Sequence, residues 1–171
     1  MPFSKLISLN EINQSLKENA YKNPTSIQEK VIPLVLDKKD VMVKAQTGSG
    51  KTASFVLPIL QLWAEPNYEG KAKIRVLVLT PTRELALQVS QAFIMFSQNF
   101  TKKPKLVSII GGQSIGEQLL DIQKGCDIVV ATTGRLIDIL DKKQLNLSNL
   151  DFFVLDEADK MLDFGFEEEL E

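Results

Sequence analysis

Residues 41–52 read Val-Met-Val-Lys-Ala-Gln-Thr-Gly-Ser-Gly-Lys-Thr, an apolar run followed by a glycine-rich loop. The apolar run predicts a buried strand over Asp40–Ala45, and the helical period of Lys51–Trp63 predicts a helix directly after the loop. A glycine-rich turn between a strand and a helix points its backbone N–H groups at phosphate oxygens. This stretch therefore predicts an α/β domain that binds a nucleotide.

The loop residues expected to contact the nucleotide are Ala45, Gln46, Thr47, Gly48, Ser49, Gly50, Lys51 and Thr52. The spacing places Lys51 on the β- and γ-phosphates and the Thr52 hydroxyl on Mg²⁺. Ala45 stands where the usual pattern begins with glycine, a departure at one position. An ordinary glycine-serine turn is the alternative, and the motif in its strand-loop-helix context argues against it.

Composition narrows the chemistry that the chain can perform. The 171 residues include no histidine and a single cysteine, Cys126, which excludes histidine catalysis, histidine-ligated zinc and an internal disulfide. The net charge of −2 combines +7 over residues 1–110 with −9 over residues 111–171, so a general polyanion-binding protein is not indicated. Because no apolar run is long enough to span a bilayer, we expect a cytoplasmic protein without a membrane partner.

The rest of the chain alternates strands and helices. Four further apolar segments are predicted as buried strands, covered on both faces: Ile74–Thr80, Lys105–Ile110, Asp127–Ala131 and Asp151–Asp156. Helices are predicted over Thr82–Phe96, Ser114–Gln123 and Arg135–Leu140, with two more near Leu9–Asn19 and Ile27–Leu36. The alternation predicts a doubly wound parallel sheet whose ligands bind beyond the carboxyl ends of the strands.

A pair of carboxylates follows the last predicted strand. Asp156 and Glu157 come directly after the apolar residues 152–155. In phosphate-loop hydrolases an Asp at such a strand end joins the loop threonine at Mg²⁺, so Asp156 is the expected metal residue and Glu157 is left to orient or deprotonate the attacking water. The alternatives are a solvated helix start, and a small-molecule kinase, which the adjacent Glu disfavours.

With the phosphate loop, Asp156-Glu157-Ala158-Asp159 resembles the name-giving motif of the DEAD-box RNA helicases of superfamily 2, in their bacterial type. Four more stretches match in family order: residues 81–86, Gly111-Gly112, residues 131–135 and residues 163–166. The resemblance covers nearly the whole chain. It implies a RecA-like fold, ATP and Mg²⁺ as cofactors, and catalytic roles for Lys51, Asp156 and Glu157.

The resemblance extends to an adenine-reading element near the N-terminus. Residues 21–28 match it, and Phe3 matches its isolated upstream aromatic. The family pattern implies that Gln28 bonds the adenine edge and that Tyr21 stacks near the base. Thr25 and Gln28 also form a capping box in sequence, which can hold together with a binding role. Ala20 stands where the family usually has glycine.

Family resemblance assigns the remaining loops to the RNA backbone, contacted without regard to sequence. The residues are Pro81, Thr82, Arg83, Gly111, Gly112, Thr132, Gly134 and Arg135. Arginines can pair with phosphates, and glycine permits close backbone approach. Each of these signals alone is also an ordinary helix start or turn. Thr133 replaces the usual proline before Gly134, which leaves the backbone there less rigid.

The sequence stops at Glu171, before the Ser-Ala-Thr motif and the second RecA-like domain of the family. We therefore expect residues 1–171 to be the first, ATP-binding domain, with the adenine element in about 1–29 and the second domain as its partner in the full-length protein. The expected function is an ATP-dependent RNA helicase, of which this piece alone binds ATP and hydrolyses it poorly. A non-enzymatic nucleotide-binding module and a DNA-directed ATPase of the same superfamily are the alternatives.

Overall fold

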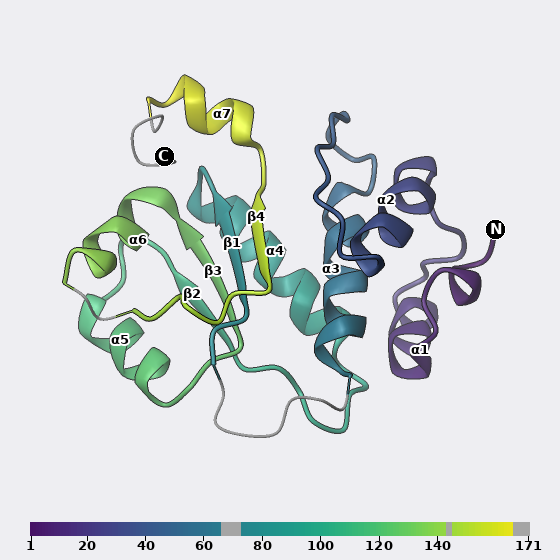
Figure 1. The fold of residues 1–171 in the computed structure, drawn as a ribbon, viewed down its shortest axis with the longest axis horizontal. Coiled ribbons are helices and arrows are strands. Elements are labelled where there is room, and N and C mark those ends of the chain that lie inside the picture. Colours follow the sequence, from purple (N-terminus) through teal and green to yellow (C-terminus); the bar gives the residue numbers. More distant parts are fainter. Residues whose placement is uncertain (66–72, 143–144, 166–171) are drawn as a thin grey trace. The chain divides into compact units, whose positions relative to one another are not determined.

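The computed structural model describes residues 1–65, 73–142 and 145–165 (Figure 1). The chain divides into two compact units. The first unit combines Met1–Glu69 with Gln91–Lys103, and the second combines Gly70–Ser90 with Pro104–Glu171. Within the described ranges, no helix has both the length and the apolar character needed to cross a bilayer.

The second unit is built on a parallel sheet. Its strands are β1 (Val76–Thr80), β2 (Leu106–Ile109), β3 (Ile128–Thr132) and β4 (Phe152–Leu155). They lie side by side in the order β2-β3-β1-β4, and all three pairings are parallel (Figure 1). Val76 lies opposite Ile128 on one side and Phe152 on the other. The carboxyl ends of the strands therefore meet at one edge, where ligands of such sheets bind.

Helices cover both faces of this sheet. The helices that follow the strands are α4 (Arg83–Phe96), α5 (Ile115–Gln123), α6 (Thr133–Leu140) and α7 (Ala158–Asp163). Leu119 of α5, Leu136 of α6 and Met161 of α7 are buried in one cluster with Leu79 and Val129 of the sheet. The other face meets α4, where the Ser90 and Ser108 hydroxyls lie 2.9 Å apart. The prediction of a doubly wound parallel α/β sheet is confirmed.

The first unit is helical among its described residues. It contains a 3₁₀ turn at Phe3–Lys5, then α1 (Asn10–Glu18), α2 (Ser26–Leu36), α3 (Lys51–Trp63) and the end of α4. Its apolar interior includes Phe3, Ile12, Leu16, Ile32 and Leu57, all less than 5% exposed. Trp63 stacks on Phe100 with ring centroids 6.3 Å apart.

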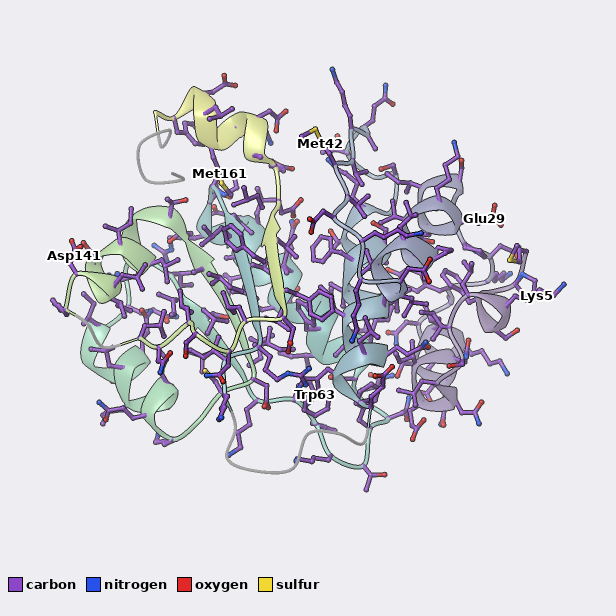
Figure 2. All side chains as sticks on the ribbon, in the orientation of Figure 1. Lys5, Glu29, Met42, Trp63, Asp141 and Met161 are labelled. Carbon is purple, nitrogen blue, oxygen red and sulfur yellow. The ribbon has the colours of Figure 1, made fainter. Side chains whose placement is uncertain are left out.

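The strand predicted over Asp40–Ala45 is wrong for this structure. The segment has no strand pairing, and Met42 projects with 99% of its surface exposed (Figure 2). A strand needs a hydrogen-bonded neighbour, because its backbone N–H and C=O groups point sideways. This segment belongs to the first unit, whereas all the described strands belong to the second. An apolar run is therefore insufficient without a partner strand in the same unit.

Strand β4 departs from the expected burial on both faces. It lies at the edge of the sheet, and its residues alternate, with Phe153 55% and Leu155 38% exposed. The start of β4 is held to β1 by Arg75, whose backbone carbonyl accepts hydrogen bonds from the N–H groups of Asp151 and Phe152. The Arg75 side chain also pairs with the Asp151 carboxylate at 2.5 Å.

Candidate nucleotide and RNA sites

The phosphate loop forms a tight turn that ends at the first residue of a helix. Gly48 and Gly50 have φ values of 80° and 89°, which only glycine adopts without strain. The Ser49 N–H donates to the Gln46 carbonyl at 3.3 Å and closes the turn. The Ser49 hydroxyl is buried and has no protein partner within the described structure. The loop thus combines a glycine-dependent backbone with an unused buried hydroxyl.

Helix α3 begins immediately after this turn, with Gly50 as its N-cap. Its first internal hydrogen bond runs from the Ser54 N–H to the Gly50 carbonyl. The N–H groups of Lys51 and Thr52 precede that bond and have no acceptor within the helix. The first turn carries no acidic residue, so nothing in it opposes an anion at the positive end of the helix dipole.

The adenine element packs directly on the phosphate loop within the first unit. Gln28 is 2% exposed, and its Nε2 donates to the Gly50 carbonyl at 3.2 Å. Its Oε1 accepts from the Thr25 N–H at 2.9 Å, so the capping box predicted at the start of α2 is confirmed. A Cβ on Gly50 would lie 2.4 Å from Gln28 Nε2. Position 50 therefore needs glycine for space as well as for φ.

Tyr21 is the first residue of this element, and Ala20 directly precedes it. The Tyr21 ring is 37% exposed and packs edge-to-face on Phe96, with centroids 5.2 Å apart. Ala20 has a φ of 61°, the left-handed conformation that explains why a glycine suits this position. Phe3 is 4% exposed and packs in the interior. Base contacts by Gln28 and Tyr21 stay predictions.

The acidic pair lies at the carboxyl end of β4. The Asp156 N–H donates to the Leu79 carbonyl at 2.9 Å, which ties it to the end of β1. Glu157 has a φ of 56° and its side chain is only 9% exposed. Its Oε2 lies 2.5 Å from the Lys160 Nζ one turn along α7. The hydrogen bond and charge of Glu157 raise the pKa of Lys160 above its ordinary value, so the lysine stays cationic.

Two of the predicted RNA loops meet in the second unit. Gly112 has a φ of 80°, and a Cβ there would lie 2.5 Å from the Arg83 Nη1. The guanidinium therefore lies directly against the backbone of the Gly111–Gly112 turn. Thr82 caps α4, because its hydroxyl accepts from the Leu85 N–H at 3.3 Å. Its preceding residue, Pro81, is half-buried.

The third predicted loop joins the same group. Thr132 is the N-cap of α6, and Gly134 is exposed with no atom near the place of a Cβ. Arg135 Nη1 donates to the Gln113 carbonyl at 2.9 Å and lies 3.4 Å from Gln118 Oε1. The loops after β1, β2 and β3 are thus neighbours, although 50 residues of sequence separate Arg83 from Thr133.

The sequence reasoning missed Lys160, Gln113 and Gln118. A signal for Gln118 exists, because it is a polar residue on the apolar stripe formed by Ile115, Leu119 and Ile122. Lys51 and Thr52 belong to the first unit and Asp156 and Glu157 to the second. The two halves of the predicted Mg²⁺ site thus belong to different units.

A parallel α/β sheet with a glycine-rich loop opening a helix defines a class of nucleotide-binding proteins. The sequence pattern of the DEAD/DEAH box helicase family matches residues 25–171. This chain belongs to that family.

The named relatives agree with this assignment. The chain is 49% identical to the ATP-dependent RNA helicase DeaD of Buchnera aphidicola, over 94% of the chain and 26% of the relative. It is 42% identical to the RNA helicase CrhR of Synechocystis, over 90% of the chain and 30% of the relative. The chain thus spans about a quarter to a third of these proteins.

A solved structure confirms the RecA-like fold of such helicases. The crystal structure of a hypothetical ATP-dependent RNA helicase from Sulfolobus tokodaii matches with a TM-score of 0.83 and 38% identity. The match covers 94% of this chain and 45% of that one. The remaining length of these proteins lies outside the match.

Proposed function

We propose that this chain is the ATP- and RNA-binding domain of an ATP-dependent RNA helicase, which acts with a second RecA-like domain in the full-length protein. One observation carries the proposal. Arg83, Gly112 and Arg135 gather at the carboxyl edge of a parallel sheet, in which the edge strand β4 is followed directly by Asp156 and Glu157. A sheet edge that offers arginines and carboxylates together suits coupling between RNA phosphates and nucleotide hydrolysis.

The residues of the phosphate loop fit a nucleotide. The unused N–H groups at the start of α3, the buried Ser49 hydroxyl without a protein partner and the open space around Gly48 all favour phosphate oxygens. We assign Lys51 to the β- and γ-phosphates and Thr52 with Asp156 to Mg²⁺. The bound metal ion would neutralise charge on the phosphates. Gln28 and Tyr21 are assigned to the adenine.

Glu157 has the role of orienting or deprotonating the attacking water. Its side chain is nearly buried, and Lys160 keeps a cation against one carboxylate oxygen. A carboxylate fixed in this way keeps one orientation, in which it can accept a hydrogen bond from the attacking water. RNA would bind through Arg83, Arg135, the glycine turn and the hydroxyls of Thr82 and Thr132, which contact backbone rather than bases. Closure of the two domains on RNA would then separate a short duplex.

The proposal is tested by ATP hydrolysis in the full-length protein, with and without single-stranded RNA. We expect RNA to stimulate turnover, and DNA of matching sequence to stimulate it far less. Turnover indifferent to both nucleic acids would contradict the proposal, and equal stimulation by DNA would favour a DNA-directed ATPase.

Two variants separate binding from chemistry. Lys51→Ala should weaken nucleotide binding, because the side chain loses its contact with the phosphates, whereas Lys44→Ala, an exposed lysine ahead of the loop, should leave it unchanged. Glu157→Gln should mainly slow hydrolysis. The measurements are the affinity for a fluorescent nucleotide and the steady-state rate. If Lys51→Ala mainly slowed hydrolysis and Glu157→Gln mainly weakened nucleotide binding, both assignments would be wrong.

A further inference from the structure

The side chain of Gln118 bridges the two ends of the Gly111–Gly112 turn. Its Nε2 donates to the Ile110 carbonyl at 2.9 Å and lies 3.2 Å from the Gln113 Oε1. Ile110 precedes the two glycines and Gln113 follows them. A single amide therefore contacts the residue on each side of the turn.

Because they are buried, these contacts restrict the conformation of the Gly111–Gly112 turn. Gln118 is 4% exposed and Ile110 is 1% exposed, so the Ile110 carbonyl and the Gln118 amide meet away from water. A buried carbonyl that loses its donor cannot regain a hydrogen bond from water, so the conformation of the turn depends on this contact. The amide thus occupies a place on α5 where helical spacing alone favours an apolar side chain.

The same amide extends the network to the second arginine of the RNA site. Gln118 Oε1 lies 3.4 Å from Arg135 Nη1, which also donates to the Gln113 carbonyl at 2.9 Å. Only 14% of the Arg135 side chain is exposed. On the other side of the turn, Gly112 lies against the Arg83 guanidinium. Both arginines therefore contact the same turn.

We propose that Gln118 is a positioning residue for RNA binding, which holds the Gly111–Gly112 turn and, through it, Arg83 and Arg135. It does not itself contact RNA. This inference rests on the proposed RNA-binding function. It predicts that loss of the amide weakens RNA binding while the nucleotide site, formed by other elements, keeps its affinity.

The test is Gln118→Met in the full-length protein, which keeps the length of the side chain and removes both hydrogen-bonding ends. The matched control is Gln123→Met, the same change at an exposed position on the same helix. Single-stranded RNA binding is measured with a non-hydrolysable ATP analogue at fixed salt. We expect roughly a tenfold loss of RNA affinity for Gln118→Met and none for the control.

A second readout separates positioning from general structural damage. In RNA-stimulated hydrolysis, the RNA concentration for half-maximal stimulation should rise roughly tenfold, while turnover at saturating RNA and the affinity for a fluorescent nucleotide stay near those of the parent. Unchanged RNA affinity, or equal loss of RNA and nucleotide binding, overturns the inference. Should the parent protein bind no RNA, the proposed function itself fails.

Gln118→Glu covers the case in which the methionine variant does not fold. The glutamate side chain has the same length as glutamine and still offers an acceptor to Arg135. Its carboxylate has no N–H group to donate to the Ile110 carbonyl. The same RNA-specific loss is expected. Parental RNA affinity in this variant also overturns the inference.

Discussion

Left-handed backbone at residues other than glycine occurs at three described positions, Ala20, Lys38 and Glu157, with φ values of 61°, 57° and 56°. A side chain with a Cβ is strained in this conformation by roughly 1–2 kcal/mol. Glu157 carries its strain at a predicted catalytic position, which is a common location for such residues. Ala20 directly precedes the adenine element, and no catalytic or binding role is predicted for its side chain. Glycine could therefore replace it and relieve the strain.

Ala20→Gly should therefore raise the free energy of unfolding by about 0.5–1 kcal/mol, because relief of strain exceeds the added entropy of the unfolded chain. The measurement is urea unfolding of both proteins. Ala64→Gly is the matched control, since Ala64 follows a helix with a φ of −77°, and it should lower stability by about as much. A loss of stability in both variants would show that Ala20 is not strained.

Lys160 is the second residue with a testable role. Lys160→Met removes the cation 2.5 Å from the buried carboxylate of Glu157. We expect kcat for ATP hydrolysis in the full-length protein to fall roughly tenfold with KM for ATP nearly unchanged, because Glu157 loses its orientation. Lys160→Arg should restore most of the rate. A variant that changes KM alone would contradict a positioning role.

At the scale of elements, the helix starts determine where chemistry can occur. The start of α2 is closed by Thr25 and Gln28, and the start of α3 is left open by Gly50, whose lack of a Cβ admits Gln28. Both helices belong to the first unit, and one amide hydrogen bond joins their starts. The cap of one helix thus supports the open end of the other.

Thr25→Ala should lower the stability of the protein by about 1 kcal/mol, because the Gln28 N–H at the start of α2 loses its side-chain acceptor. Thr25→Ser keeps the hydroxyl and should stay close to the parent. Denaturant midpoints with unchanged slopes provide the measurement. If serine and alanine behave alike, the hydroxyl does not stabilise this helix.

At the scale of the whole molecule, sheet order rather than chain order determines which loops become neighbours. β3 lies between β2 and β1, and β1 lies between β3 and β4. The loop after β3 can therefore contact the loop after β2, as Arg135 does with Gln113. A substitution in α5 can in this way alter a site formed by residues distant in sequence.

The buried thiol of Cys126, in the apolar cluster of the second unit, makes the stability of the protein depend on pH in the alkaline range. Burial, and secondarily the charge of Asp127, raises the pKa of Cys126 from its ordinary value of 9.0 to about 11. Below pH 9 both the folded and the unfolded state keep the thiol proton, so it contributes no change. Between pH 9 and pH 11 the unfolded state releases that proton first, which lowers stability as the pH rises.

Cys126→Ala should lack this part of the alkaline decline. Its stability should be lower than that of the parent at pH 8, because a buried side chain is truncated, and the gap should narrow by on the order of 1–2 kcal/mol toward pH 11. Unfolding curves at several pH values measure the gap. A constant gap would mean that the thiol titrates alike in the folded and unfolded states.

Local patterns in the sequence determined most elements and the chemistry of their loops. The helix Lys51–Trp63 agrees with its prediction at both ends, and four of the five predicted strands are present. The capping box at Thr25 could also be predicted from the sequence, because it depends on residues three positions apart. These features follow from short-range hydrogen bonds and side-chain periodicity, which a sequence displays directly.

Only the tertiary structure decided which segments pair and which polar side chains meet. The apolar run at Asp40–Ala45 forms no strand among the described residues, because a strand depends on a neighbour that the sequence does not specify. Gln118 likewise shows its role only through its contacts with Ile110, Gln113 and Arg135. Such contacts arise when elements pack in three dimensions, and the order of residues along the chain does not encode them locally.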